Sequence, residues 1–106
     1  MENGKSTGSK FGDLIEGEIP VLVDVFATWC GPCKTLEPTI KQVAQKMQGK
    51  IKVIKVDIDK NPHVASAYQV QGVPTLLLFR KGKILWRVSG VMSANQIEKS
   101  IQEAIG

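Results

Sequence analysis

The sequence is poor in the residues on which several classes of protein depend. It contains two cysteines, one histidine and few aromatic residues, which make up 6% of the 106 residues. Two cysteines and one distant histidine fall short of the four ligands that a structural zinc site takes, so we expect no metal. The 14 basic and 10 acidic residues leave a net charge of +4. The basic residues form no block and are not interleaved with aromatic residues, which argues against nucleic-acid binding.

Long hydrophobic runs are also missing. No stretch approaches the roughly 20 apolar residues of a membrane-spanning helix, and the polar start of the chain lacks the apolar core of a signal peptide. We therefore expect no contact with a membrane and a cytoplasmic location. The length fits one domain, which we predict over residues 11–106 after a weakly ordered arm, residues 1–10. In a reducing compartment, two closely spaced cysteines are more often catalytic than structural.

The two cysteines lie where a predicted strand meets a predicted helix. Residues 21–27 form an apolar, β-branched run of the kind that makes a buried strand, and from residue 36 to residue 47 apolar residues recur at helical spacing. Cys30 would then lie at the helix N-terminus, where unpaired N–H groups and the helix dipole favour a thiolate. Cys33, three residues further on, is within reach of a disulfide. Pro32 suits the first helical turn.

The remaining pattern predicts an α/β fold with a mixed central sheet flanked by helices on both faces. Further strands are expected at residues 51–58, 75–79 and 84–88, and helices near residues 11–17, 62–69 and 93–105. The helix between residues 51 and 80 argues for a right-handed crossover and a parallel core. The last two strands would form an antiparallel hairpin. Ser93 and Gln96 have the spacing of a capping box.

Asp24 is the only charged residue in the predicted buried strand. Burial disfavours the charged form of a carboxyl group and raises its pKa. Asp24 could therefore exchange a proton near neutral pH. The alternative is a structural role, with Asp24 hydrogen-bonded to the backbone.

Together these motifs resemble the thioredoxin family. The resemblance is carried by Trp29-Cys30-Gly31-Pro32-Cys33-Lys34, with Asp24 before it and Gly72-Val73-Pro74-Thr75 and Gly90 after it. It implies a thioredoxin-like fold and protein-disulfide reduction by thiol–disulfide exchange, with roles in cell redox homeostasis and electron transport. Cys30 would be the nucleophile, Cys33 the less exposed resolving cysteine and Asp24 the proton acceptor. Lys55 would either pair with Asp24 and modulate it or extend along the surface into solvent.

The resemblance also implies the surroundings of the cysteines. Trp29, Gly31, Pro32 and Lys34 would form the active-site loop. A substrate-binding groove would be lined by Val73, Pro74, Thr75, Gly90 and Val91, with a cis peptide bond before Pro74. No cofactor would be bound, because reducing equivalents would come from NADPH through a thioredoxin reductase. The other partners would be disulfide-containing proteins, and we expect a monomer. Disulfide isomerase or oxidase activity, or a non-catalytic binding subunit, remain the alternatives.

Overall fold

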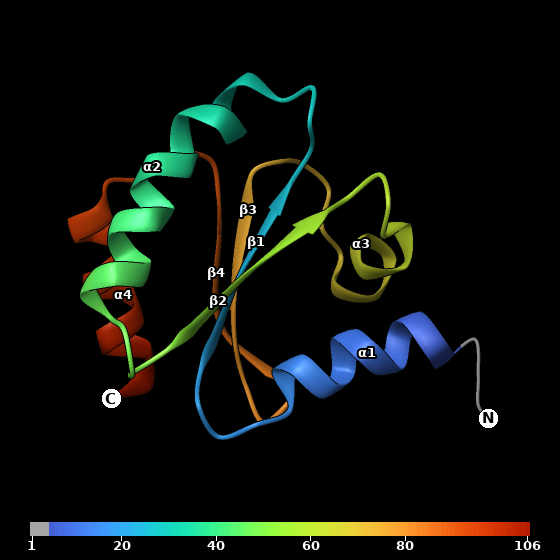
Figure 1. The fold of residues 1–106 in the computed structure, drawn as a ribbon, viewed down its shortest axis with the longest axis horizontal. Helices are drawn as coiled ribbons and strands as arrows, with labels where there is room; N and C mark the ends of the chain where they lie inside the picture. Colours follow the sequence, from blue (N-terminus) through green and yellow to red (C-terminus); the bar gives the residue numbers. More distant parts are fainter. Residues whose placement is uncertain (1–4) are drawn as a thin grey trace.

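A computed structural model describes the backbone of residues 5–106 and the side chains of residues 10–106. The sheet lies between two pairs of helices, with α2 and α4 on one face and α1 and α3 on the other (Figure 1). In chain order the elements are α1 (Lys5–Ile15), β1 (Val21–Phe26), α2 (Gly31–Lys46), β2 (Lys52–Asp57), α3 (Pro62–Tyr68), β3 (Thr75–Arg80), β4 (Lys83–Ser89) and α4 (Ala94–Ile105).

The sheet is mixed, with strand order β2-β1-β3-β4. β1 runs parallel to β2 and antiparallel to β3, and β3 and β4 form the predicted hairpin. The fold class is therefore confirmed. The parallel pair is not the one expected, however, because β2 and β3, the strands on either side of α3, lie on opposite edges of β1. β1 pairs along both edges, and the direction of each pairing depends on contacts that a pattern of successive strands and helices does not reveal.

Alternation along β1 divides the core between the two faces of the sheet. Val21, Val23 and Val25 point toward α1 and α3. Leu22 packs on the opposite face, against apolar side chains of α2 and α4 that include Leu36 and Ile97. We call these the α1/α3 face and the α2/α4 face.

The N-terminal region differs in extent from the prediction. α1 begins at Lys5, upstream of the helix that we predicted from Phe11. Residues 1–4 lie outside the described part of the chain, so the predicted weakly ordered arm, residues 1–10, stays a prediction. Within residues 5–20 no strand precedes β1.

The helix ends that matter for the site follow local sequence rules. Cys30 is the N-cap residue of α2, and Pro32 lies in the first turn. The capping box predicted at the start of α4 is present, with Ser93 and Gln96 bonded reciprocally. Because β1 and β2 are parallel, the loops that follow them emerge at the same edge of the sheet, beside the start of α2.

Candidate active site at the start of helix α2

Cys30 and Cys33 form a disulfide within the first turn of α2. Cys30 has an extended backbone (φ −91°, ψ 112°), and its Sγ accepts a hydrogen bond of 3.1 Å from the Cys33 N–H. The Cα atoms are 5.3 Å apart, which a disulfide spans without movement of the backbone. In this oxidised form both cysteines are buried, so the prediction that Cys33 is the less exposed cysteine of the reduced protein stays a prediction. Residue exposure is 4% for Cys30 and 7% for Cys33, because both pack in one cluster with Ala27.

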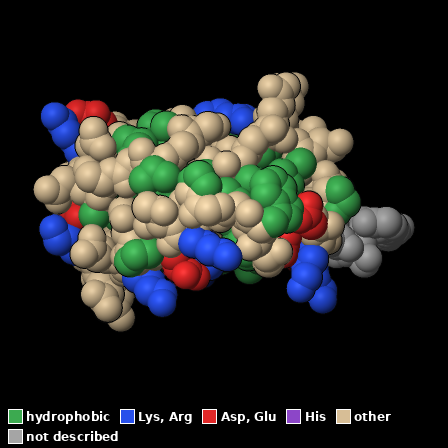
Figure 2. Space-filling model, turned by 90° about the horizontal axis from the view of Figure 1, so that it is seen from above, with side chains coloured by type: hydrophobic (Ala, Val, Ile, Leu, Met, Phe, Trp, Pro, Cys, Tyr) green, Lys and Arg blue, Asp and Glu red, His purple; other side chains and the backbone are tan. Residues whose placement is uncertain are grey.

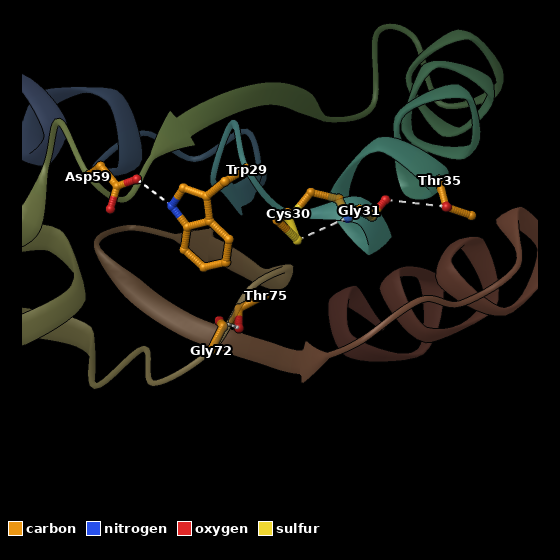
Figure 3. Close-up of a disulfide and its surroundings, with 8 residues drawn as sticks. Trp29, Cys30, Gly31, Thr35, Asp59, Gly72 and Thr75 are labelled. Carbon is orange, nitrogen blue, oxygen red and sulfur yellow. Dashed lines mark hydrogen bonds between the residues drawn. A yellow bond between two sulfur atoms is a disulfide. The ribbon is translucent and has the colours of Figure 1, made fainter.

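Trp29 is held on the surface beside the disulfide. Its side chain is 70% exposed, and its Nε1–H donates a 2.8 Å hydrogen bond to Oδ2 of Asp59 (Figure 3). Asp59 follows β2, and its own N–H donates to Oδ1 of Asp57, which fixes the turn. Sequence analysis missed Asp59. The available signal was the parallel β1–β2 pair, since residues that follow parallel neighbours meet at one edge of the sheet.

The loop before β3 lies against the disulfide. The peptide bond between Val73 and Pro74 is cis, as the resemblance implied. Val73 packs against the cluster that contains both cysteines. Thr75 is buried, and its hydroxyl donates to the Gly72 carbonyl over 2.7 Å, while the Gly90 N–H donates to the Pro74 carbonyl over 2.9 Å.

The residues of the predicted groove therefore come together at one end of the molecule. Gly90, with φ +98°, is in a conformation that favours glycine. Gly31 and Pro32 are exposed, and Val91 is 49% exposed. Figure 2 looks onto this end and shows hydrophobic side chains gathered across its middle. Exposed apolar area of this kind is typical of a surface that binds other proteins.

Asp24 is buried on the α2/α4 face, at 3% exposure. The pKa of its carboxyl group is raised to about 6, chiefly because of burial. The charge of Lys55 acts to lower this pKa, and the charge of Glu37 acts to raise it. The Oδ1 atom has no hydrogen-bond partner. A carboxyl group of this pKa is close to half protonated in mildly acidic solution, so it can both accept and release a proton.

Lys55 lies opposite Asp24 in the parallel register of β1 and β2. Its ammonium group binds Glu37 of α2, with 2.9 Å between Nζ and Oε2, and lies 4.7 Å from the centroid of the Phe26 ring. The ion pair of Lys55 is thus with Glu37, and the lysine side chain is 43% exposed. Sequence analysis missed Glu37, although its position four residues after Cys33 puts the two side chains on the same side of α2.

A cavity of about 240 Å³ opens between the start of α2, the end of β1 and Lys55 of β2. Cys33, Lys34 and the pair of Glu37 and Lys55 contribute to its wall, together with residues 26–28. The cavity therefore brings the second cysteine next to charged groups and solvent. Cys30 is absent from the lining of this cavity, which gives the two cysteines different surroundings.

Among residues 5–106 there is no group of three or more histidine, cysteine, aspartate or glutamate side chains that could hold a metal ion. In the same range, no helix has the length and apolar character to cross a membrane.

Comparison with known proteins agrees with this geometry. The family model for thioredoxin matches residues 3–103. The chain belongs to the thioredoxin family. It is 43% identical to Thioredoxin 1 of Chlorobaculum tepidum over 89% of its length and 94% of that protein, and 37% identical to the thioredoxin of Rickettsia felis over 99% and 100%. It is also 42% identical to the chloroplastic Thioredoxin Y of Oryza sativa subsp. japonica, of which it spans 61%.

Solved structures give the same result. A mutant thioredoxin from Halobacterium salinarum superposes with a TM-score of 0.81 at 38% identity, covering 91% of this chain and 83% of that one. Thioredoxins are disulfide oxidoreductases, and this chain has the disulfide-bonded cysteine pair in the first turn of α2. This thioredoxin-family protein is therefore a protein-disulfide reductase that works by dithiol–disulfide exchange.

Proposed function

We propose that Cys30 is the attacking thiolate, Cys33 the resolving thiol and Asp24 the acceptor of the Cys33 proton. The observation that carries this assignment is the position of Cys30 as N-cap of α2, with the Cys33 N–H directed at its sulfur. A sulfur at a helix N-terminus faces unpaired N–H groups and the positive end of the helix dipole, which stabilise a thiolate. The thiolate is the form that attacks a disulfide.

The reaction then runs in two exchanges. The Cys30 thiolate attacks one sulfur of the substrate disulfide, a mixed disulfide forms, and the other substrate sulfur leaves as a thiolate and takes up a proton. Cys33 next gives its proton to Asp24 and attacks the Cys30 sulfur, which releases the second substrate sulfur. The substrate gains the two electrons that the cysteine pair loses. The two substrate thiolates take up protons from solvent, and the one proton that the pair loses, that of Cys33, goes to Asp24. With a pKa of about 6, the Asp24 carboxyl group is mostly ionised at pH 7 and ready to accept.

The substrate would bind at the exposed apolar surface around the disulfide. Trp29 and Val91 are large hydrophobic side chains that remain exposed, and we propose that they flank the groove formed by Gly31, Pro32, Val73 and Gly90, with the buried Pro74 and Thr75 beneath it. Lys34 would lie at its edge. An extended substrate segment could pair with the backbone beside Pro74 in the manner of an added strand. Asp59 would keep the Trp29 ring in position through its hydrogen bond.

The assignment of the two cysteines is tested by trapping the intermediate. In the Cys33→Ser variant, a mixed disulfide between Cys30 and a disulfide-containing protein such as insulin should accumulate, because nothing resolves it. The Cys30→Ser variant is the matched control and should form little adduct at neutral pH. Mass spectrometry of the quenched, alkylated mixture identifies the modified cysteine. An adduct that forms mainly on Cys33 would reverse the roles.

We also propose that the cysteine pair is recharged from NADPH by a thioredoxin reductase, that the protein binds no cofactor of its own, and that it works as a monomer in the cytoplasm. The disulfide within one chain supports the proposed monomer, since both redox-active sulfurs lie on that chain. In a coupled assay with NADPH, thioredoxin reductase and insulin, NADPH oxidation should depend on the concentration of this protein. If NADPH oxidation did not depend on the concentration of the unsubstituted protein, the proposed route would be contradicted.

A further inference from the structure

Glu37 is a charged residue of the site to which the exchange mechanism gives no task. It lies on α2, four residues after Cys33, and its carboxylate is 2.9 Å from the Lys55 ammonium. Lys55 in turn starts from the β2 position that neighbours Asp24. The lysine therefore has two carboxylates within its range, one buried and one exposed, and it binds the exposed one.

We infer that Glu37 is a positioning residue, which holds the Lys55 ammonium away from Asp24 and so adjusts the proton exchange between Asp24 and Cys33. The inference rests on the proposed role of Asp24 as proton acceptor. The residues involved lie close together, since Glu37, Lys55 and Cys33 all line the same cavity of about 240 Å³.

Two contacts keep Lys55 in this position. The first is the ion pair with Glu37, in which Lys55 holds the pKa of Glu37 below its usual range, so that Glu37 stays ionised. The second is the Phe26 ring, whose centroid is 4.7 Å from Nζ, within the range of a cation–π contact. The Asp24 Oδ1 atom, in contrast, is buried and has no partner. An unpaired buried carboxyl group keeps its proton to a higher pH than a paired one.

Other charged groups lie on the elements packed around Asp24, and each has different surroundings. Those on α2 are Lys34, which lines the cavity, and Lys41, which acts on Glu37. On β2, Asp57 accepts the Asp59 N–H. On α4, Glu98 is paired with Lys46 of α2. Lys55 is therefore the cation that a change at Glu37 would release toward Asp24.

The inference is tested by a double-mutant cycle that reads the pKa of Asp24 directly. The carboxyl carbon of Asp24 is titrated by NMR in the oxidised protein, where no exchange reaction runs. At a pKa of about 6, about half of Asp24 is protonated at pH 6. In Glu37→Gln we expect this fraction to fall at least about twofold, because Lys55 becomes free to pair with Asp24. In the Lys55→Gln background the same substitution should have a clearly smaller effect.

Two outcomes overturn the inference. Equal effects of Glu37→Gln with and without Lys55 would show that Glu37 acts through its own charge alone, and an unchanged titration would show no influence at all. Glu103→Gln, an equal change of charge on an exposed α4 residue, is the matched control and should leave the titration of Asp24 unchanged. A failure of Asp24 as proton acceptor would be seen separately, as a resolution rate that does not follow the measured pKa.

Discussion

The two faces of the sheet are packed with different chemistry. On the α1/α3 face, Phe11, Tyr68 and Phe79 form an aromatic cluster with ring centroids 5.0–5.8 Å apart. The α2/α4 face is mainly aliphatic and holds Asp24, the one buried carboxylate among residues 10–106. The aromatic rings gain favourable edge-to-face contacts in addition to burial. The buried carboxyl group has the opposite effect, since its charged form loses hydration.

The difference can be expressed as a free energy. Raising the pKa of a carboxyl group from 3.8 to about 6 corresponds to about 3 kcal/mol of lost stability at neutral pH. This is a large part of the net stability of a domain of this size. The loss falls on the face that carries the cysteines and the cavity, while the other face has no buried carboxyl group among residues 10–106. Both faces contribute buried core, and the destabilising carboxyl group lies on the face that carries the reactive residues.

The largest expected effect comes from weakening the α1/α3 face. Phe79 is fully buried and contacts the rings of Phe11 and Tyr68. Phe79→Ala should lower the free energy of unfolding by about 3–5 kcal/mol, because it removes these contacts and leaves a cavity. Urea unfolding of the oxidised protein measures the loss. Insulin reduction per folded molecule should stay near that of the unchanged protein.

Phe26→Ala is the matched comparison on the α2/α4 face. Phe26 is only partly buried and packs beside the cysteines and under Lys55. We expect a loss of stability of about 1–2 kcal/mol, together with a changed pH dependence of insulin reduction, because Lys55 loses one of its two contacts. If Phe79→Ala cost less than Phe26→Ala, or changed that pH dependence more, the proposed division between the two faces would be wrong.

The features of the two faces that could be predicted from sequence are those that depend on residues close together in the chain. The alternation of apolar residues along residues 21–27 identified a strand buried on both faces, and it made Asp24 conspicuous because a charge interrupts that run. The helical spacing after Cys33 put Cys30 at a helix N-terminus. Both signals depend on neighbours within a few residues, which a sequence pattern records.

What could not be predicted depends on contacts between distant segments. The pairing of β3 with β1 is decided by which strands bury their edges together, and the pattern of one strand does not contain that information. The ion-pair partner of Lys55 could not be predicted for the same reason, because Asp24 and Glu37 are both within reach of the lysine. Only the packing of α2 on the sheet decides between them. The bond from Trp29 to Asp59 likewise required the two loops to be brought to one edge.

An effect of the opposite sign is expected from the buried carboxyl group of the α2/α4 face. Asp24 binds a proton more tightly in the folded than in the unfolded protein, because its pKa is raised to about 6. As pH rises from about 4 to about 6, the unfolded state loses this proton first, and stability falls. Asp24→Asn removes that dependence. The free energy of unfolding of the variant should therefore increase relative to that of the unsubstituted protein as the pH rises, by up to about 3 kcal/mol at pH 7. Urea unfolding at pH 4, 5, 6 and 7 gives the difference, and the exposed Asp13→Asn variant controls for the change in charge. A difference that is flat with pH would mean that the carboxyl group of Asp24 is not destabilising, and that the two faces differ in packing alone.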